Sequence, residues 1–160
     1  MEASGGGGTL GFRQEVWTQA VAAIHDFSFT GLGLGAFREI VRLLYPLGIP
    51  PTYDIAHAHN FLLQSALDFG LPGAIALFAI LWVAIVAVVQ LWQGSNGHRG
   101  QQSKNVHLLS IGFAGSLAAQ GVFGQLDAIS MGAKTNFLFW TLVALIFGLL
   151  IRTTDSDAGR

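Results

Sequence analysis

From Phe69 to His98 the sequence has no charged side chain for thirty consecutive positions. Within this stretch, Leu71–Trp92 contains 22 residues, enough for a helix rising ~1.5 Å per residue to cross a hydrocarbon core of ~30 Å. Pro72 falls in the first turn of such a helix, where a missing backbone N–H costs little. This stretch therefore predicts a transmembrane helix over residues 71–92.

Two further uncharged stretches follow the first. Residues 107–126 are apolar but rich in glycine, and residues 135–151 are dense in Leu, Phe and Ile up to Arg152. Both are long enough to cross a bilayer. The sequence therefore predicts an all-α integral membrane protein with about three spans in residues 71–151.

The composition also favours lipid as the solvent for much of the chain. Charged residues make up 11% and hydrophobic residues 52%, whereas an ordinary soluble domain has roughly 25% charged residues. A net charge of -1 provides no basic field, which argues against nucleic acid as a partner. The absence of cysteine excludes disulfides, thiolate metal sites and cysteine nucleophiles.

Basic residues in the short segments predict the orientation of the spans. The loop Gln93–Lys104 contains Arg99 and no acidic residue, and the tail 152–160 begins with a basic residue. The positive-inside rule places both in the cytoplasm. Residues 11–70 and the loop before the third span then face outward.

The predicted outward segment, residues 11–70, follows a flexible N-terminal segment, residues 1–10, that contains four consecutive glycines. Its first apolar face is made by residues spaced one, three and four apart, which predicts a short helix: Val16, Trp17, Ala20, Val21 and Ile24. A second amphipathic stretch covers residues 36–47. Between them, Gly31, Gly33 and Gly35 predict a tight turn, since a dinucleotide site needs a preceding strand and none is predicted here.

The densest polar cluster in this segment is His57-Ala58-His59-Asn60. On a helix, positions two apart do not face each other, so we do not expect the two histidines to share a metal ion, and Asp54 is the only nearby acid that could complete such a site. The residues alone leave two interpretations open. Either one histidine caps the following helix while the other meets water, or the cluster carries chemistry.

A wider pattern of short motifs favours the second interpretation. Five motifs occur in this order: Gly11, Arg13 and Trp17; Gly31-Leu32-Gly33-Leu34-Gly35-Ala36-Phe37; Ala56-His57-Ala58-His59-Asn60; Asp68-Phe69-Gly70-Leu71-Pro72-Gly73; and Asp127-Ala128-Ile129 with Gly132-Ala133-Lys134. This order, around the predicted spans, resembles the O-antigen ligase and polymerase superfamily of bacterial envelope glycan enzymes. The resemblance covers residues 11 to about 150.

The resemblance implies a multi-pass glycosyltransferase of the bacterial or archaeal cytoplasmic (inner) membrane, acting in polysaccharide or lipopolysaccharide biosynthesis. In this family the donor is a glycan linked to undecaprenyl diphosphate, and the acceptor lies outside that membrane. Ligases use a lipid A core as acceptor, whereas polymerases use another repeat unit. The transfer requires no nucleotide and no metal, so no cofactor is expected.

By the motif match, Arg13 corresponds to the family's functional arginine and His59 to its essential histidine. A guanidinium can hold two oxygens of the departing diphosphate and stays charged. An imidazole is a suitable general base for the acceptor hydroxyl. We therefore hypothesise that Arg13 binds the diphosphate and His59 activates the acceptor. Secondary residues would orient the base or touch sugar: His57, Asn60, Tyr53 and Asp54.

Four further charged residues have weaker assignments. Arg38 and Arg42 lie four apart and would share a helix face, where they would bind phosphate or core anions or, as the favoured alternative, face water or lipid headgroups. Asp127 and Lys134 would line the donor cavity or simply anchor the chain at the membrane interface.

Full-length members of this family have about a dozen spans, so the chain resembles their C-terminal portion. We expect a fragment whose missing N-terminal transmembrane helices are its partner, and which is inactive alone. The alternatives are an O-antigen or exopolysaccharide polymerase and a non-catalytic membrane module. A transporter is disfavoured because the predicted spans carry no ionisable residue near their middle.

Overall fold

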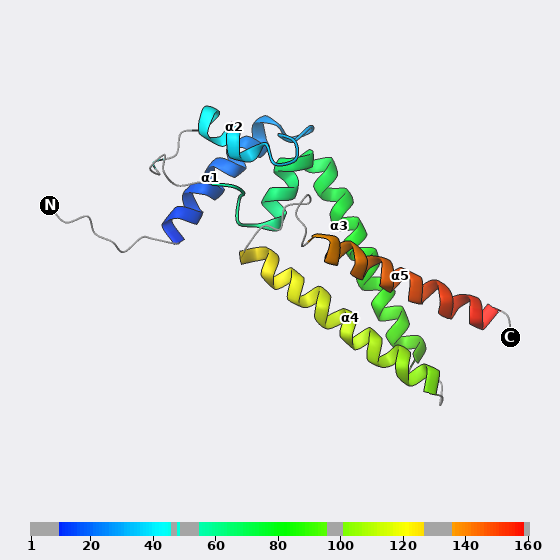
Figure 1. The fold of residues 1–160 in the computed structure, drawn as a ribbon. Helices are drawn as coiled ribbons and strands as arrows, with labels where there is room; N and C mark the ends of the chain where they lie inside the picture. The colour runs from blue at the N-terminus through cyan, green and yellow to red at the C-terminus, as the bar shows by residue number, and fades with distance from the viewer. Residues whose placement is uncertain (1–9, 46–47, 49–54, 96–100, 127–135, 159–160) are drawn as a thin grey trace. The chain divides into compact units, whose positions relative to one another are not determined.

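The computed structural model describes residues 10–45, 48, 55–95, 101–126 and 136–158. Within these ranges the chain is helical and contains no strand. Its helices, shown in Figure 1, are α1 (Leu10–Asp26), α2 (Phe37–Leu44), α3 (Phe61–Ser95), α4 (Gln101–Leu126) and α5 (Asn136–Ala158).

Three of these helices are long and apolar enough to cross a membrane, over Phe61–Ser95, Gln101–Gln125 and Phe137–Asp155. This confirms the predicted all-α architecture with three membrane-spanning helices. α3 begins ten residues before Leu71, and α5 continues past Arg152 to Ala158. The start of α3 and the end of α5 contain polar residues, and composition alone does not assign such residues to a membrane helix.

The chain divides into two compact units, and the first contains residues 1–77 and 124–133. Its core gathers buried apolar residues from α1, α2, the residue after α2, the segment before α3, and α3 itself: Val16, Ala20, Ala23, Phe37, Val41, Tyr45, Ile55, Ala58 and Leu67. The α1 members recur at four and three positions, as one face of a helix requires. Val21, which we predicted on this face, is instead 56% exposed. The buried face runs through Val16, Ala20 and Ala23, and Val21 lies outside it.

The second unit contains residues 78–123 and 134–160. Here Ala87 and Val88 of α3 pack with Ile146 of α5, and partly buried residues complete the cluster: Phe113, Leu117, Leu142, Phe147 and Leu150. Many other large apolar side chains of this unit are exposed, among them Trp82 and Leu108. Such exposure suits helices whose outer faces meet lipid.

α3 is broken at Gly70, where the backbone adopts φ 71° and ψ 179°. The turn after α1 docks on this break through two backbone hydrogen bonds, Leu32 N–H to Leu67 O at 2.6 Å and Leu71 N–H to Ser28 O at 2.8 Å. Gly31 also has a positive φ of 66°, and a Cβ there would lie 2.5 Å from the Gly70 nitrogen. The glycine turn predicted between the first two helices is thus confirmed, and two glycines allow backbone to approach backbone.

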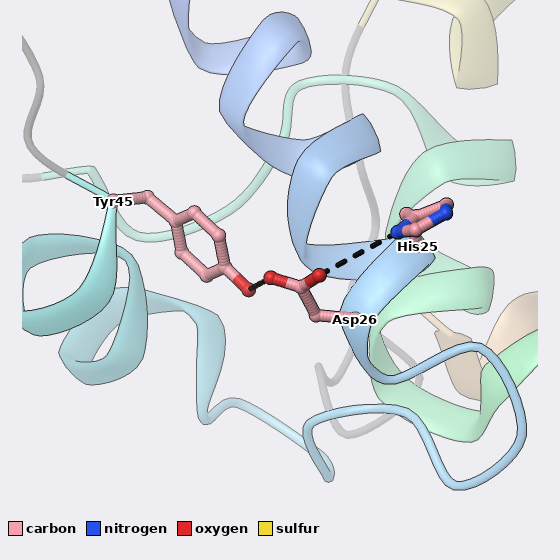
Figure 2. A network of polar contacts seen from close by, with 3 residues as sticks. All are labelled: His25, Asp26 and Tyr45. Atoms are coloured by element: carbon pink, nitrogen blue, oxygen red, sulfur yellow. Dashed lines mark hydrogen bonds and ion pairs between the residues drawn. The ribbon is translucent and has the colours of Figure 1, made fainter.

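The end of α2 is joined to the end of α1 by a polar contact, shown in Figure 2. The buried Tyr45 hydroxyl donates a hydrogen bond of 2.7 Å to Asp26 Oδ2, and His25 Nδ1 lies 3.5 Å from Asp26 Oδ1. The hydrogen bond from Tyr45, with that from His25, lowers the pKa of Asp26. Burial, together with the Asp26 carboxylate, raises the pKa of Tyr45 to about 12.

Replacing either close-approach glycine should destabilise the first unit. We expect Gly31→Ala and Gly70→Ala each to cost at least about 1–3 kcal/mol, because an alanine at positive φ is strained and its methyl group would overlap backbone atoms. Thermal unfolding followed by circular dichroism in nanodiscs measures the effect. Gly115→Ala in α4, where no atom lies within 4 Å of the added carbon, is the control, and an equal loss there would contradict the explanation.

The phenol of Tyr45 should titrate far above an ordinary tyrosine. The chain has two tyrosines, so Tyr53→Phe leaves the ultraviolet absorbance of tyrosinate to report Tyr45 alone, with an expected midpoint of about 12. Since the folded state raises this pKa, its stabilisation is complete below pH ~10 and is lost as the pH rises toward 12. Adding Asp26→Asn should lower the midpoint, and a midpoint near 10 without that change would refute the pairing.

Candidate functional site

α1 lies along the segment that precedes α3. The indole Nε1–H of Trp17 donates a hydrogen bond of 2.8 Å to the Ala58 carbonyl oxygen. One and a half turns earlier on α1, the Phe12 ring meets the His59 ring edge-on, with centroids 6.1 Å apart. Arg13 directly follows Phe12 and is half-buried. The helix that carries Arg13 is therefore packed on the turn that carries His59. We call this turn, residues 57–60, the histidine turn.

His57 and His59 precede α3 and are not helical. Their rings meet edge-on with centroids 4.3 Å apart, and the His59 backbone N–H donates a hydrogen bond of 3.4 Å to His57 Nδ1. Our premise that a helix keeps the two rings apart is wrong, because His59 has a φ of 50° that turns the backbone at this point. Among the described residues, no three His, Cys, Asp or Glu side chains gather as a metal site would require.

Asn60 begins α3 as its N-terminal cap. Its Oδ1 accepts the backbone N–H groups of Leu62 at 3.0 Å and Leu63 at 3.1 Å, as an N-cap side chain does. Its Nδ2 donates to Gln125 Oε1 at 3.4 Å. The interpretation in which a histidine caps this helix is therefore replaced: the amide of Asn60 does so, which leaves both imidazoles for other contacts.

A buried polar pair supports the same turn from inside α3. The Ala58 backbone N–H donates to Gln64 Oε1 at 2.9 Å, and Gln64 Nε2 donates to Asp68 Oδ1 at 2.8 Å. Gln64 and Asp68 are each only 3% exposed. The sequence analysis named Asp68 only as part of a motif and gave it no role, and it missed Gln64 entirely. The available signal was two polar residues four apart on an otherwise apolar face.

The other candidate residues are placed as follows. Arg38 and Arg42 are both exposed on α2, whose buried residues are Phe37 and Val41. The remaining four candidates lie outside the described residues: Tyr53, Asp54, Asp127 and Lys134.

Comparison with known proteins gives one family match. A search of curated proteins finds no match to the chain. A family model described as O-antigen ligase matches residues 1–78, which include α1, α2, the histidine turn and the broken first part of α3. With three helices able to span a membrane, this family indicates a bacterial membrane protein of glycosyltransferase type. The match supports the assignment of this chain to the O-antigen ligase and polymerase superfamily.

Proposed function

We propose that this chain is part of a longer membrane protein that transfers a glycan from a polyprenyl diphosphate, of the undecaprenyl type, to an acceptor on the outward side of the cytoplasmic membrane, and that the chain is inactive alone. The observation that carries the proposal is the packing of α1 on the histidine turn. The edge-on contact of Phe12 with His59 and the hydrogen bond from Trp17 to Ala58 support a shared site for Arg13 and His59. Residues 11–70 would form the outward part of that site.

In this proposal Arg13 binds the diphosphate of the donor. Transfer breaks the bond between the anomeric carbon and a phosphate oxygen, and the diphosphate leaves with the electron pair. A guanidinium stabilises that developing charge because it donates two parallel hydrogen bonds to phosphate oxygens and stays protonated. The half-buried position of Arg13 beside Phe12 favours such a role, since partial exclusion of water strengthens the attraction.

His59 would act as the general base. The acceptor hydroxyl oxygen forms the new bond to the anomeric carbon, and its proton passes to the imidazole. Two edge-on ring contacts, with Phe12 and His57, restrict the orientation of this half-buried side chain. His57 would assist through its Nδ1, which accepts the His59 backbone N–H. The acceptor is either a lipid A core-like glycolipid, as in a ligase, or a further repeat unit, as in a polymerase.

Removing either group should abolish transfer without affecting insertion. We expect His59→Ala to lower the rate about 10²–10⁴-fold, the usual contribution of a positioned general base. Arg13→Ala should lower it about 10²–10³-fold, as loss of one charge-stabilising donor does. The measurement is glycan transfer by the full-length protein in membranes, with helical content checked by circular dichroism.

Two matched variants make the result specific. His25→Ala removes an exposed imidazole on the same helix as Arg13 and should leave transfer unchanged. Arg13→Lys keeps the charge but loses bidentate geometry, so it should restore only part of the rate. Normal transfer by both alanine variants at positions 13 and 59 would reject this function and favour a non-catalytic membrane module.

A further inference from the structure

A continuous series of hydrogen bonds runs through the interior of the first unit and holds the residue between the two histidines. Trp17 Nε1–H binds the Ala58 carbonyl oxygen, the Ala58 N–H binds Gln64 Oε1, and Gln64 Nε2–H binds Asp68 Oδ1. We refer to Trp17, Ala58, Gln64 and Asp68 as the Ala58 clamp. Both polar groups of the Ala58 peptide backbone are thus fixed by side chains from two different helices.

Asp68 determines which way the Gln64 amide points. A side-chain amide can present either its oxygen or its nitrogen to a neighbour. The Asp68 carboxylate accepts hydrogen bonds when ionised, so it selects the Nε2 end of Gln64 at 2.8 Å. The oxygen end then accepts the backbone N–H of Ala58 at 2.9 Å, a donor that favours the same orientation of the amide.

Burial makes every unpaired polar atom of this arrangement costly, and within the described residues Asp68 Oδ2 is buried without a hydrogen-bond partner. Gln64 and Asp68 are each 3% exposed, and a buried polar group without a partner costs roughly 1–3 kcal/mol. An apolar pair would fill the same space without that requirement. What the polar pair adds is a fixed direction for the Ala58 N–H, one residue before His59.

His59 needs such support because its backbone is unfavourable. Its φ of 50° lies in the left-handed region, which a residue with a side chain adopts only when its surroundings impose it. The clamp grips the peptide immediately before this residue. Resting on the proposed function, we infer that Gln64, oriented by Asp68, is a positioning residue that sets the His59 imidazole against the acceptor hydroxyl.

Exchanging the amide and the carboxylate between positions 64 and 68 tests this inference. Gln64→Glu keeps the oxygen that accepts the Ala58 N–H, but sets a second carboxylate oxygen against Asp68 Oδ1. At a pH high enough to ionise both carboxyl groups, so that they do not share a proton, the repulsion should displace the side chain and release Ala58. In the double variant Gln64→Glu with Asp68→Asn, the amide is at position 68 and the carboxylate is at position 64. The amide can donate to the carboxylate, so a donor again faces an acceptor. Gln14→Glu, the same substitution at an exposed position of α1, is the control.

Two readouts distinguish positioning from a merely structural role. Hydrogen exchange of the Ala58 amide, by NMR on the 160-residue chain in nanodiscs, should be faster in Gln64→Glu and return to the original rate in the double variant. In the full-length protein, kcat for glycan transfer should fall about 10–100-fold in Gln64→Glu, since small misplacement of a reacting group has effects of this size. KM for the donor should stay unchanged, and kcat should recover in the double variant.

The outcomes separate this inference from the proposed function. If His59→Ala abolishes transfer while Gln64→Glu transfers normally, or the double variant fails to recover kcat, the positioning role is overturned and the proposed function stands. If kcat and KM change together in Gln64→Glu, the role is structural and the inference is again overturned. If His59→Ala transfers normally, the proposed function itself fails, and the positioning of a base fails with it.

Discussion

The close approach of Gly31 and Gly70 is the constraint on which the site-bearing unit depends. It lets the turn after α1 exchange backbone hydrogen bonds with the break in α3. Any side chain at either position would meet backbone atoms, so the contact requires the smallest residue on both sides. Because the break also ends the first part of α3, the same contact fixes the helix that presents Gln64 and Asp68 to the histidine turn. The positions of Gln64 and Asp68 thus depend on a backbone contact between two glycines.

The sequence predicted the three spanning helices and the glycine turn because each depends on one dominant local signal. A long apolar stretch without charged residues predicts a membrane helix, and three alternating glycines predict a turn. The face of α1 was predicted less well, since Val21 shares the spacing of its buried neighbours but points outward. Spacing alone does not identify which edge of an apolar stripe tertiary packing selects.

The site was predictable in part. The motif order indicated Arg13 and His59 as a pair, and the structure packs the helix of one on the turn of the other. The contact between His57 and His59 could not be predicted, because it depends on a left-handed backbone at a residue other than glycine. Gln64 escaped notice because a buried glutamine inside an apolar run carries no motif, and its importance comes only from the Ala58 amide, which approaches it in three dimensions.

The break at Gly70 has a further consequence for how α3 meets the bilayer. A straight helix of 35 residues would be about 52 Å long, far more than a hydrocarbon core of ~30 Å, and would suffer strong hydrophobic mismatch. Counting from Leu71 shortens the helix to about 37 Å, which removes most of that excess, and Gln64 and Asp68 then precede the break at Gly70. The ten residues before Leu71, which include Gln64 and Asp68, therefore do not have to satisfy the length of the hydrocarbon core.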